Sequence, residues 1–207
     1  MALHGYGDTV AQFHEATQLE TGADLADVAV LFPQASPDTV GKAAWNVGEG
    51  TADQDDLGTL VFAIEDITAT YDIDPKRVFL VGYSNGASMA YQLARADAFA
   101  AIVGVAGNIS ARDWQTCDPE HRVPVLLIHG RDDDVVAMTG DPVTGVPSVH
   151  ALLGRWADWN GAVLNESANA YSNGHLTHYF VWDGKLVAEL AALSKAGHDW
   201  PIGFDDR

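Results

Sequence analysis

The segment Val78–Leu93 combines the features of a buried strand, a tight turn and a helix in a short stretch of chain. Val78–Val81 is an apolar run typical of a buried strand, and it leads directly into Gly82-Tyr83-Ser84-Asn85-Gly86 and a helical pattern. Between a strand and a helix, Gly-x-Ser-x-Gly forces its serine onto a sharp turn with the hydroxyl above the end of the sheet. The glycines are needed because a Cβ atom would collide with the neighbouring strand or helix. The pattern predicts an α/β chain with Ser84 as an exposed nucleophile at a helix N-terminus, where negative charge is stabilised.

Chain order predicts the partners of this serine. A serine nucleophile needs a histidine base, and the histidine needs an orienting carboxylate. After this type of turn the expected order is serine, acid, histidine, with both partners on loops that follow later strands. The apolar run Val123–Ile128 precedes three adjacent carboxylates, Asp132-Asp133-Asp134, and His198 lies on a loop after another apolar stretch. The other histidines lie upstream of these aspartates or in contexts less typical of a strand end. We therefore predict Ser84, one of the three aspartates and His198 as the catalytic set.

The first residues of the chain predict where an oxyanion would bind. Leu3-His4-Gly5-Tyr6-Gly7 has the pattern of a strand end followed by a glycine-rich turn. Such a loop can direct a backbone N–H at the oxyanion, beside the N–H of the residue that follows the nucleophile. We predict the main-chain N–H groups of Tyr6 and Asn85 as the two donors. The alternative is that His4-Gly5 belongs to an ordinary tight turn.

Taken together, these motifs resemble the polyhydroxybutyrate depolymerase and feruloyl esterase-like branch of the α/β-hydrolases. The matching stretches lie in order along nearly the whole chain: Leu3-His4-Gly5, Ala44-Trp45-Asn46, Asp55–Gly58, Ile73–Val78, Gly82–Ala87, His129-Gly130 with Asp133, Trp156 with Asn160-Gly161, and His198–Pro201. The resemblance implies an α/β-hydrolase fold, with a mostly parallel sheet flanked by helices. It places the catalytic acid at Asp133, and it implies hydrolysis of acetyl, feruloyl or short hydroxyalkanoate esters without a cofactor.

The chain departs from this family at both ends. Family members usually have further strands before the Leu-His-Gly segment and a helix after the histidine loop. We therefore expect a fold trimmed of the usual N-terminal strands and C-terminal helix, built as a single catalytic domain over 1–207. Without these edge strands, unpaired backbone N–H and C=O groups would be exposed at the sheet edge and could pair with a second copy of the chain. A homodimer through the sheet edge is therefore one expectation. The compartment stays open: cytoplasmic, or secreted with a signal peptide that this chain lacks.

The charge balance restricts the partners. The chain has 29 acidic and 11 basic residues and a net charge of −18. Such a surface repels nucleic acid and anionic membranes, so we expect neither as a partner. Self-repulsion at this charge is screened when salt is abundant, which predicts a salt-adapted protein; a merely acidic surface is the alternative. Asp132-Asp133-Asp134 could bind Ca²⁺, but adjacent carboxylates do not by themselves supply convergent ligands, so we expect no metal.

The remaining pattern predicts alternating strands and helices. We expect helices over Val10–Leu19, Leu57–Tyr71, the segment after Ser84 as far as Ala96, and Ser148–Asn160. We expect strands over Val28–Phe32, Ala101–Val105, Val123–Ile128, Tyr179–Trp182 and Leu186–Leu193, the last two joined by a hairpin turn at Asp183-Gly184. The segments 35–51, 106–120 and 140–146 are expected to be irregular.

Two tryptophans are candidates for the substrate pocket. The flat apolar faces of Trp45 and Trp200 would suit ferulate or polyester segments, whereas core packing is the alternative for each. No long insertion has the pattern of a lid, so an open cleft is expected. The same scaffold could serve another serine hydrolase, such as a peptidase or a thioesterase, or a catalytically inactive binding protein.

Overall fold

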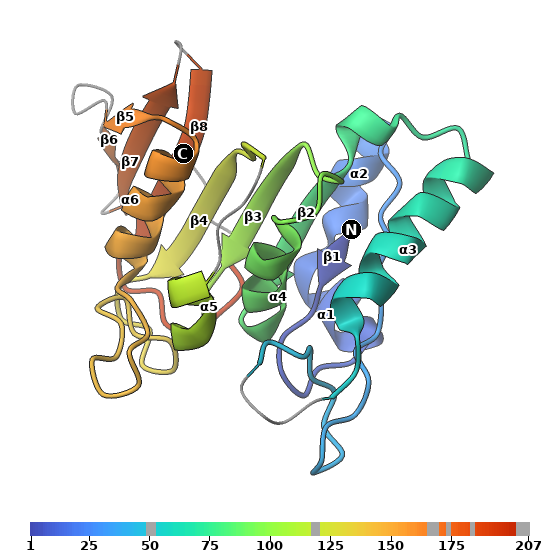
Figure 1. Ribbon diagram of the computed structural model, residues 1–207, viewed down its shortest axis with the longest axis horizontal. Coiled ribbons are helices and arrows are strands. Elements are labelled where there is room, and N and C mark those ends of the chain that lie inside the picture. Colours follow the sequence, from blue (N-terminus) through green and yellow to red (C-terminus); the bar gives the residue numbers. More distant parts are fainter. Residues whose placement is uncertain (49–52, 117–120, 165–169, 173–174, 183–184, 202–207) are drawn as a thin grey trace.

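The computed structural model describes residues 1–48, 53–116, 121–164, 170–172, 175–182 and 185–201 (Figure 1). In this part of the chain one sheet has the strand order β1-β2-β3-β4-β8-β7-β5, with β6 beside β7. Its parallel part consists of β1 (Ala2–Leu3), β2 (Phe79–Tyr83), β3 (Ala101–Val105), β4 (Val125–Gly130) and β8 (Lys185–Leu193). Its antiparallel part adds β7 (His175–Trp182) on β8, with β5 (Val163–Leu164) and β6 (Ala170–Ser172) both on β7.

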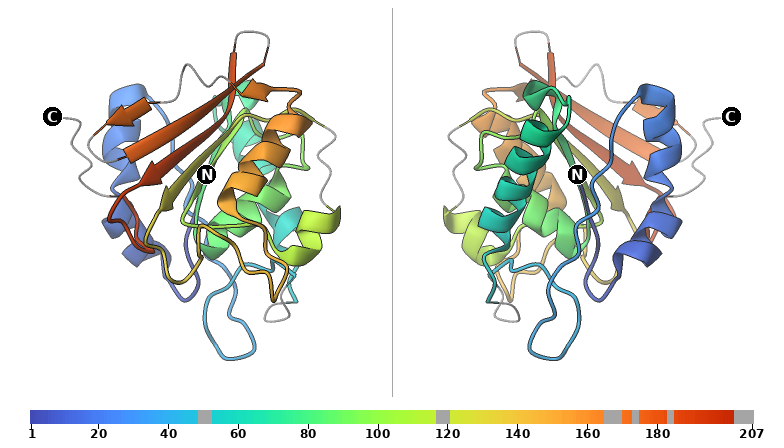
Figure 2. Two further views of the ribbon diagram at one scale, coloured as in Figure 1. Left: turned by 90° about the vertical axis from the view of Figure 1, so that its left-hand side faces the viewer. Right: turned by 90° about the vertical axis from the view of Figure 1, so that its right-hand side faces the viewer.

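Helices cover both faces of the sheet (Figure 2). On one face lie α3 (Asp56–Thr70), α4 (Asn85–Leu93), α5 (Ala111–Thr116) and α6 (Val149–Trp159). On the other face lie α1 (Val10–Thr17) and α2 (Leu19–Ala26), and a short 3₁₀ turn, η1 (Pro75–Arg77), precedes β2. The predicted α/β architecture, with helices on both faces of a mostly parallel sheet, is confirmed.

The core lies between the sheet and the helices α4 and α6. Leu80, Ile102, Leu127 and Leu190 come from four neighbouring parallel strands and are fully buried. They belong to one apolar cluster with Met89 and Leu93 of α4 and with Leu152 and Trp156 of α6. Because close-packed interiors resist displacement, the carboxyl ends of β2, β4 and β8 form a rigid edge for side chains that follow them.

Most of the predicted elements are confirmed. Helix α3 begins one residue before the predicted Leu57, and Asp55 caps it by accepting a hydrogen bond from the Gly58 N–H at 2.9 Å. Helix α6 is capped in the same way by the Ser148 side chain. The pairing of β7 with β8 brings Trp182 opposite Lys185, as a hairpin requires, although the predicted turn at 183–184 lies outside the described residues.

Four expectations on secondary structure are wrong. The segment Val28–Phe32 is extended but forms no strand; its carbonyl at Leu31 accepts one hydrogen bond from the Ala2 N–H, because β1 is too short to pair with more. The helix predicted over Val10–Leu19 ends at Thr17, since Gln18 takes a left-handed conformation with φ 49°, and α2 starts afresh after it. Helix α4 ends at Leu93 rather than near Ala96. The segment 106–120 contains the short α5, which has too few residues to show a helical period.

The sheet edge beside β1 borders a groove of about 1160 Å³. Apolar residues of β2, α3 and the extended segment line it, among them Leu31, Ile64, Ile67 and Phe79, and Phe79 is 48% exposed. Within the described residues no helix is long and apolar enough to cross a bilayer. A homodimer through this edge stays a prediction.

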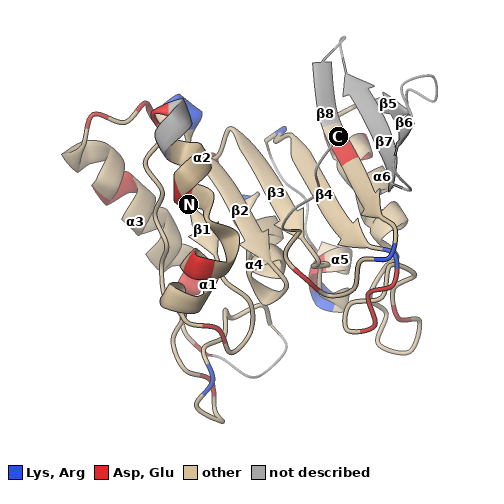
Figure 3. Cartoon of the chain, turned by 180° about the vertical axis from the view of Figure 1, so that it is seen from behind, with Lys and Arg blue, Asp and Glu red and all other residues tan. Residues whose placement is uncertain are grey.

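Acidic residues are spread over the helices and loops, and basic residues are sparse (Figure 3). We predict that the melting temperature rises with NaCl between about 0.01 M and 2 M. At 0.01 M the Debye length is roughly 30 Å, so carboxylates repel across most of the molecule, whereas at 1 M it is roughly 3 Å. The compact state carries the denser charge and gains more from screening than the unfolded chain does.

Thermal unfolding in NaCl, sulfate and perchlorate at matched ionic strength separates this screening from salting-out, because salting-out ions also strengthen apolar burial. A melting temperature that stays flat or falls as NaCl is added would contradict salt adaptation.

Candidate active site

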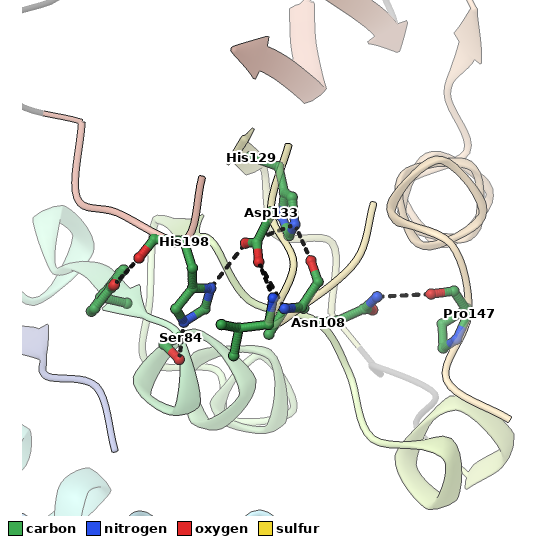
Figure 4. A network of polar contacts seen from close by, with 9 residues as sticks. Ser84, Asn108, His129, Asp133, Pro147 and His198 are labelled. Carbon is green, nitrogen blue, oxygen red and sulfur yellow. Dashed lines mark hydrogen bonds and ion pairs between the residues drawn. The ribbon is translucent and has the colours of Figure 1, made fainter. Parts of the chain in front are cut away.

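The structure brings Ser84, Asp133 and His198 together at the carboxyl edge of the sheet (Figure 4). Ser84 directly follows β2, Asp133 lies on the loop after β4, and His198 lies on the loop after β8. The His198 Nε2 atom is 2.8 Å from Ser84 Oγ, and His198 Nδ1 is 2.9 Å from Asp133 Oδ2. A carboxylate, an imidazole and a hydroxyl thus form one hydrogen-bonded chain. This is the geometry in which an imidazole can remove the serine proton.

The serine is held on a strained turn. Ser84 has φ 53° and ψ −118°, and its N–H donates to the carbonyl of Val105 in the adjacent strand at 2.9 Å. A Cβ on Gly82 would lie 2.2 Å from the Gly86 carbonyl oxygen, and a Cβ on Gly86 would lie 2.4 Å from the Leu3 carbonyl oxygen. Only glycines at these two positions allow β1, β2 and α4 to approach so closely. The tight approach fixes the serine hydroxyl in front of the imidazole.

We predict that Gly86→Ala destabilises the fold by about 1–3 kcal/mol, because the new methyl group would overlap backbone oxygens of Leu3 and His4 that cannot move aside. For a chain of this size, the melting temperature is expected to fall by roughly 2–12 °C. The control is Gly154→Ala in α6, where a Cβ meets nothing within 4 Å. That variant should be neutral or more stable by up to about 1 kcal/mol. Equal melting temperatures for the two variants would contradict this account of the turn.

The surroundings of Asp133 separate it from its two acidic neighbours. Asp133 is buried, and its Oδ1 atom accepts hydrogen bonds from the N–H groups of Val135 (3.0 Å) and Val136 (2.7 Å). These two donors leave Oδ2 directed at His198. Asp132 and Asp134 are exposed to solvent. The backbone of the loop therefore selects one carboxylate of the three as the partner of the imidazole.

A second histidine supports this loop. His129, at the end of β4, is 2% exposed, and its Nε2 atom lies 2.7 Å from the Val136 carbonyl oxygen and 3.4 Å from Asp133 Oδ2. A carbonyl can only accept, so Nε2 carries a proton and donates it. Burial lowers the pKa of His129, which keeps the ring neutral near pH 7. His129 thus ties the far end of the loop to β4 without adding charge beside the carboxylate.

In the loop after β1, the Tyr6 N–H has no hydrogen-bond partner among the described residues. The Gly5 N–H donates to Asp8 Oδ2 at 3.1 Å, and the Gly7 N–H donates to the Ala43 carbonyl at 2.8 Å. Between described residues, the N–H groups of Tyr6 and Asn85 make no hydrogen bond. With no partner in the described part of the chain, both N–H groups can donate to an oxygen bound near Ser84.

His4 fixes the shape of that loop. Its ring is fully buried, and Nε2 accepts a hydrogen bond from the Ala35 N–H at 3.0 Å. The ring proton must then sit on Nδ1, which donates to the Gly5 carbonyl at 2.7 Å. The carbonyl of His4 itself accepts from the indole N–H of Trp45 at 2.9 Å. The conformation of this loop, in which the Tyr6 N–H has no partner among the described residues, is thus set by a neutral, buried imidazole.

Trp45 is a core residue, so the prediction that it walls a substrate pocket is wrong. Only 2% of it is exposed, and it packs in the main apolar cluster. Its main chain holds the Asn85 side chain, whose Oδ1 accepts from the Trp45 N–H at 2.7 Å. Trp200 is half-buried and packs edge-on against Phe13 and Tyr83. A pocket role for Trp200 stays a prediction.

Sequence reasoning missed the supporting roles of His4 and His129. Each is the polar residue at the end of a buried strand and is followed directly by glycine. A polar ring at such a buried position must find hydrogen-bond partners, and that requirement was the available signal. Within the described residues, no group of three or more His, Cys, Asp or Glu side chains is placed to hold a metal ion.

Comparison with known proteins identifies the family. Residues 1–117 match the family described as esterase PHB depolymerase. The chain belongs to this family. It is 28% identical to feruloyl esterase B of Piromyces equi over an alignment of 211 positions, which covers 92% of the chain and 39% of that protein. It is 27% identical to the putative esterase NocK of Nocardia uniformis subsp. tsuyamanensis over 147 residues, which cover 68% of the chain and 41% of that protein. The chain thus matches less than half the length of both relatives.

Solved structures agree on the fold. The acetyl xylan esterase from Aspergillus awamori superimposes with a TM-score of 0.71 at 18% identity, covering 97% of the chain and 83% of that structure. SOBER1 of Arabidopsis thaliana superimposes with a TM-score of 0.60 at 18% identity, covering 97% and 90%. The fold is that of the α/β-hydrolases, and together with the family match it confirms the resemblance seen in the sequence motifs. That residues 1–207 form a single catalytic domain stays a prediction.

Proposed function

We propose that this protein hydrolyses carboxylic esters through a serine-bound acyl intermediate. The observation that carries the proposal is the continuous hydrogen-bonded chain from Asp133 Oδ2 through His198 to Ser84 Oγ, with contacts of 2.9 and 2.8 Å. Membership of the esterase PHB depolymerase family and the similarity to feruloyl esterase B support the choice of esters over other carbonyl substrates.

The residues of the site have distinct roles in the proposed reaction. The Nε2 atom of His198 takes the proton from Ser84 Oγ as that oxygen attacks the ester carbonyl. Asp133 holds the imidazole with its proton on Nδ1 and stabilises the charged ring that forms. The negative oxygen of the tetrahedral intermediate is bound by the N–H groups of Tyr6 and Asn85. Its collapse transfers the proton from Nε2 to the departing alcohol and leaves an acyl group on Ser84. A water then gives a proton to His198 Nε2 as it attacks the acyl carbonyl, and collapse of this second intermediate releases the acid while the proton returns to Ser84 Oγ.

We propose short-chain, feruloyl-type and hydroxyalkanoate polyester esters as substrates. Hydrolases named for feruloyl and acetylxylan esters are among the relatives of the chain, and the half-buried Trp200 follows His198 by two residues. No cofactor is required for this chemistry, because the nucleophile, base and oxyanion donors all belong to the chain.

A substrate panel tests the reaction class. Acetyl and butyryl p-nitrophenyl esters, methyl ferulate and 3-hydroxybutyrate oligomers are compared with amides and thioesters of the same acyl groups. We expect esters to exceed the matched amides in kcat/KM by at least about 100-fold. A serine-directed phosphonate should abolish the turnover. Faster turnover of amides or thioesters would indicate a peptidase or a thioesterase, and no turnover of any compound would favour an inactive binding protein.

A further inference from the structure

Tyr83 is the last residue of β2 and directly precedes Ser84. It connects β2 to the loop after β8 that carries His198, here called the histidine loop. Its hydroxyl donates a hydrogen bond of 2.8 Å to the backbone carbonyl of His198, across 115 positions of sequence. The carboxyl end of β2 therefore positions two groups. Ser84 follows it directly, and the Tyr83 hydroxyl, one residue earlier, bonds the backbone of the histidine that faces Ser84.

The Tyr83 ring is held in place by packing on several sides. Phe13 of α1 stacks on it with an interplanar angle of 16° and a centroid distance of 6.4 Å. Trp200 meets it edge-on at 6.2 Å, and the His198 imidazole lies tilted at 5.5 Å. The loop after β1 also approaches closely, since a Cβ on Gly5 would lie 3.0 Å from Tyr83 Cδ1. A ring fixed in this way gives its hydroxyl a defined direction.

The histidine loop has few other anchors. At its start, the N–H groups of Arg131 and Asp132 donate to the carbonyls of Leu193 (2.9 Å) and Ala196 (3.0 Å). Beyond Ala196, the backbone of residues 197–201 makes no hydrogen bond to another described residue except the one from the Tyr83 hydroxyl. Among the described residues, the Tyr83 hydroxyl is therefore the one hydrogen-bond partner of the His198 backbone, and this bond helps to set the position of the imidazole.

The hydroxyl is available as a donor over a wide pH range. Burial, with a smaller contribution from the carboxylates of Asp199, Asp8 and Asp133, raises the pKa of Tyr83 to about 12. The phenol thus stays protonated wherever an esterase of this kind would operate.

We propose that Tyr83 is a positioning residue for the reaction, in that its hydroxyl holds the His198 backbone so that the imidazole reaches both Ser84 Oγ and Asp133 Oδ2. The inference rests on the proposed serine mechanism. The hydroxyl acts through the histidine and does not contact the reacting atoms. Small displacements of a catalytic group are costly, since about 1 Å of misplacement can reduce a rate by roughly 100-fold.

The test is Tyr83→Phe, which keeps the ring and its packing and removes only the donor. We expect kcat on a p-nitrophenyl ester to fall about ten-fold with KM unchanged, because ground-state binding of the ester does not use the imidazole. The far-downfield proton resonance of His198 Nδ1–H on Asp133 should weaken or shift. Tyr83→Leu, which also loses the ring, should be impaired more strongly.

Tyr91→Phe is the matched control. Tyr91 is a buried tyrosine of α4 whose hydroxyl points at Gly104 of β3, so the variant loses a buried phenol hydroxyl without touching the histidine loop. It should keep kcat and the downfield resonance, whatever its melting temperature. A Tyr83→Phe variant with kcat within two-fold of the parent and an unchanged resonance would overturn the inference. So would an equal loss of kcat in Tyr91→Phe. Ser84→Ala, assayed in parallel, distinguishes the two claims: if it stays active, the serine mechanism fails and the role of Tyr83 fails with it.

Discussion

Replacing Ser84 by alanine is expected to reduce ester hydrolysis by a factor on the order of 10⁴ or more, while the protein stays folded. The hydroxyl makes its one catalytic contact with His198 Nε2, and without it no acyl-enzyme can form. His198→Ala should cost a comparable factor, because the members of such a set act as a unit. The rates are measured on a p-nitrophenyl ester, beside thermal unfolding of each variant.

Ser88→Ala is the control for this pair. Ser88 lies one turn further along α4, and its hydroxyl donates to the Asn108 carbonyl at 2.6 Å and not to the imidazole. This variant should retain activity even where it loses some stability. More than a tenth of the parent rate in Ser84→Ala or His198→Ala would contradict the assignment of the nucleophile and base.

Asp133→Asn is expected to lower kcat by on the order of 10³ to 10⁴-fold. Two backbone N–H groups, from Val135 and Val136, donate to Oδ1, so the carbonyl oxygen of the new amide should occupy that position. The amide NH₂ would then face His198 Nδ1 and force the ring proton onto Nε2. In that tautomer the ring cannot accept the proton of Ser84.

Asp132→Asn and Asp134→Asn are the matched controls, since both carboxylates are exposed neighbours of Asp133. Substitutions of exposed loop residues usually have small effects, so each should change kcat by less than about ten-fold. The measurement is kcat of the three variants on one ester, which tests which aspartate is the catalytic acid. A larger loss at position 132 or 134 than at 133 would contradict the choice of acid.

The parts of the fold that follow from local pattern could be predicted from the sequence. The glycines of the pentapeptide determine the turn at Ser84 by steric exclusion, and continuous apolar runs mark the buried parallel strands. The relative order of serine, acid and histidine then places all three at one edge, because parallel strands end on the same side. Only the family resemblance distinguished Asp133 from Asp132 and Asp134 in the sequence. The burial of Asp133 depends on hydrogen bonds from N–H groups of its own loop, which no local pattern indicates.

Other features depend on tertiary contacts that no local pattern encodes. Val28–Phe32 has strand composition, yet its neighbour β1 is too short to pair with it. Trp45 has the flat apolar face of a pocket residue, but its indole N–H donates to the buried carbonyl of His4, and this partner places it in the core. The position of Tyr83 within Gly-x-Ser-x-Gly accepts many residue types, so no sequence pattern indicates its contact with a loop over a hundred residues away.

The proposal that Ser84 is the nucleophile of an esterase is tested most directly by active-site labelling. The protein is incubated with a fluorophosphonate that mimics the tetrahedral intermediate, and the adduct is located by peptide mass spectrometry. We expect one phosphonyl group per chain on Ser84, loss of ester hydrolysis in step with labelling, and strongly slowed labelling of His198→Ala. Labelling of a different residue, or full ester hydrolysis by a protein labelled at Ser84, would contradict the account.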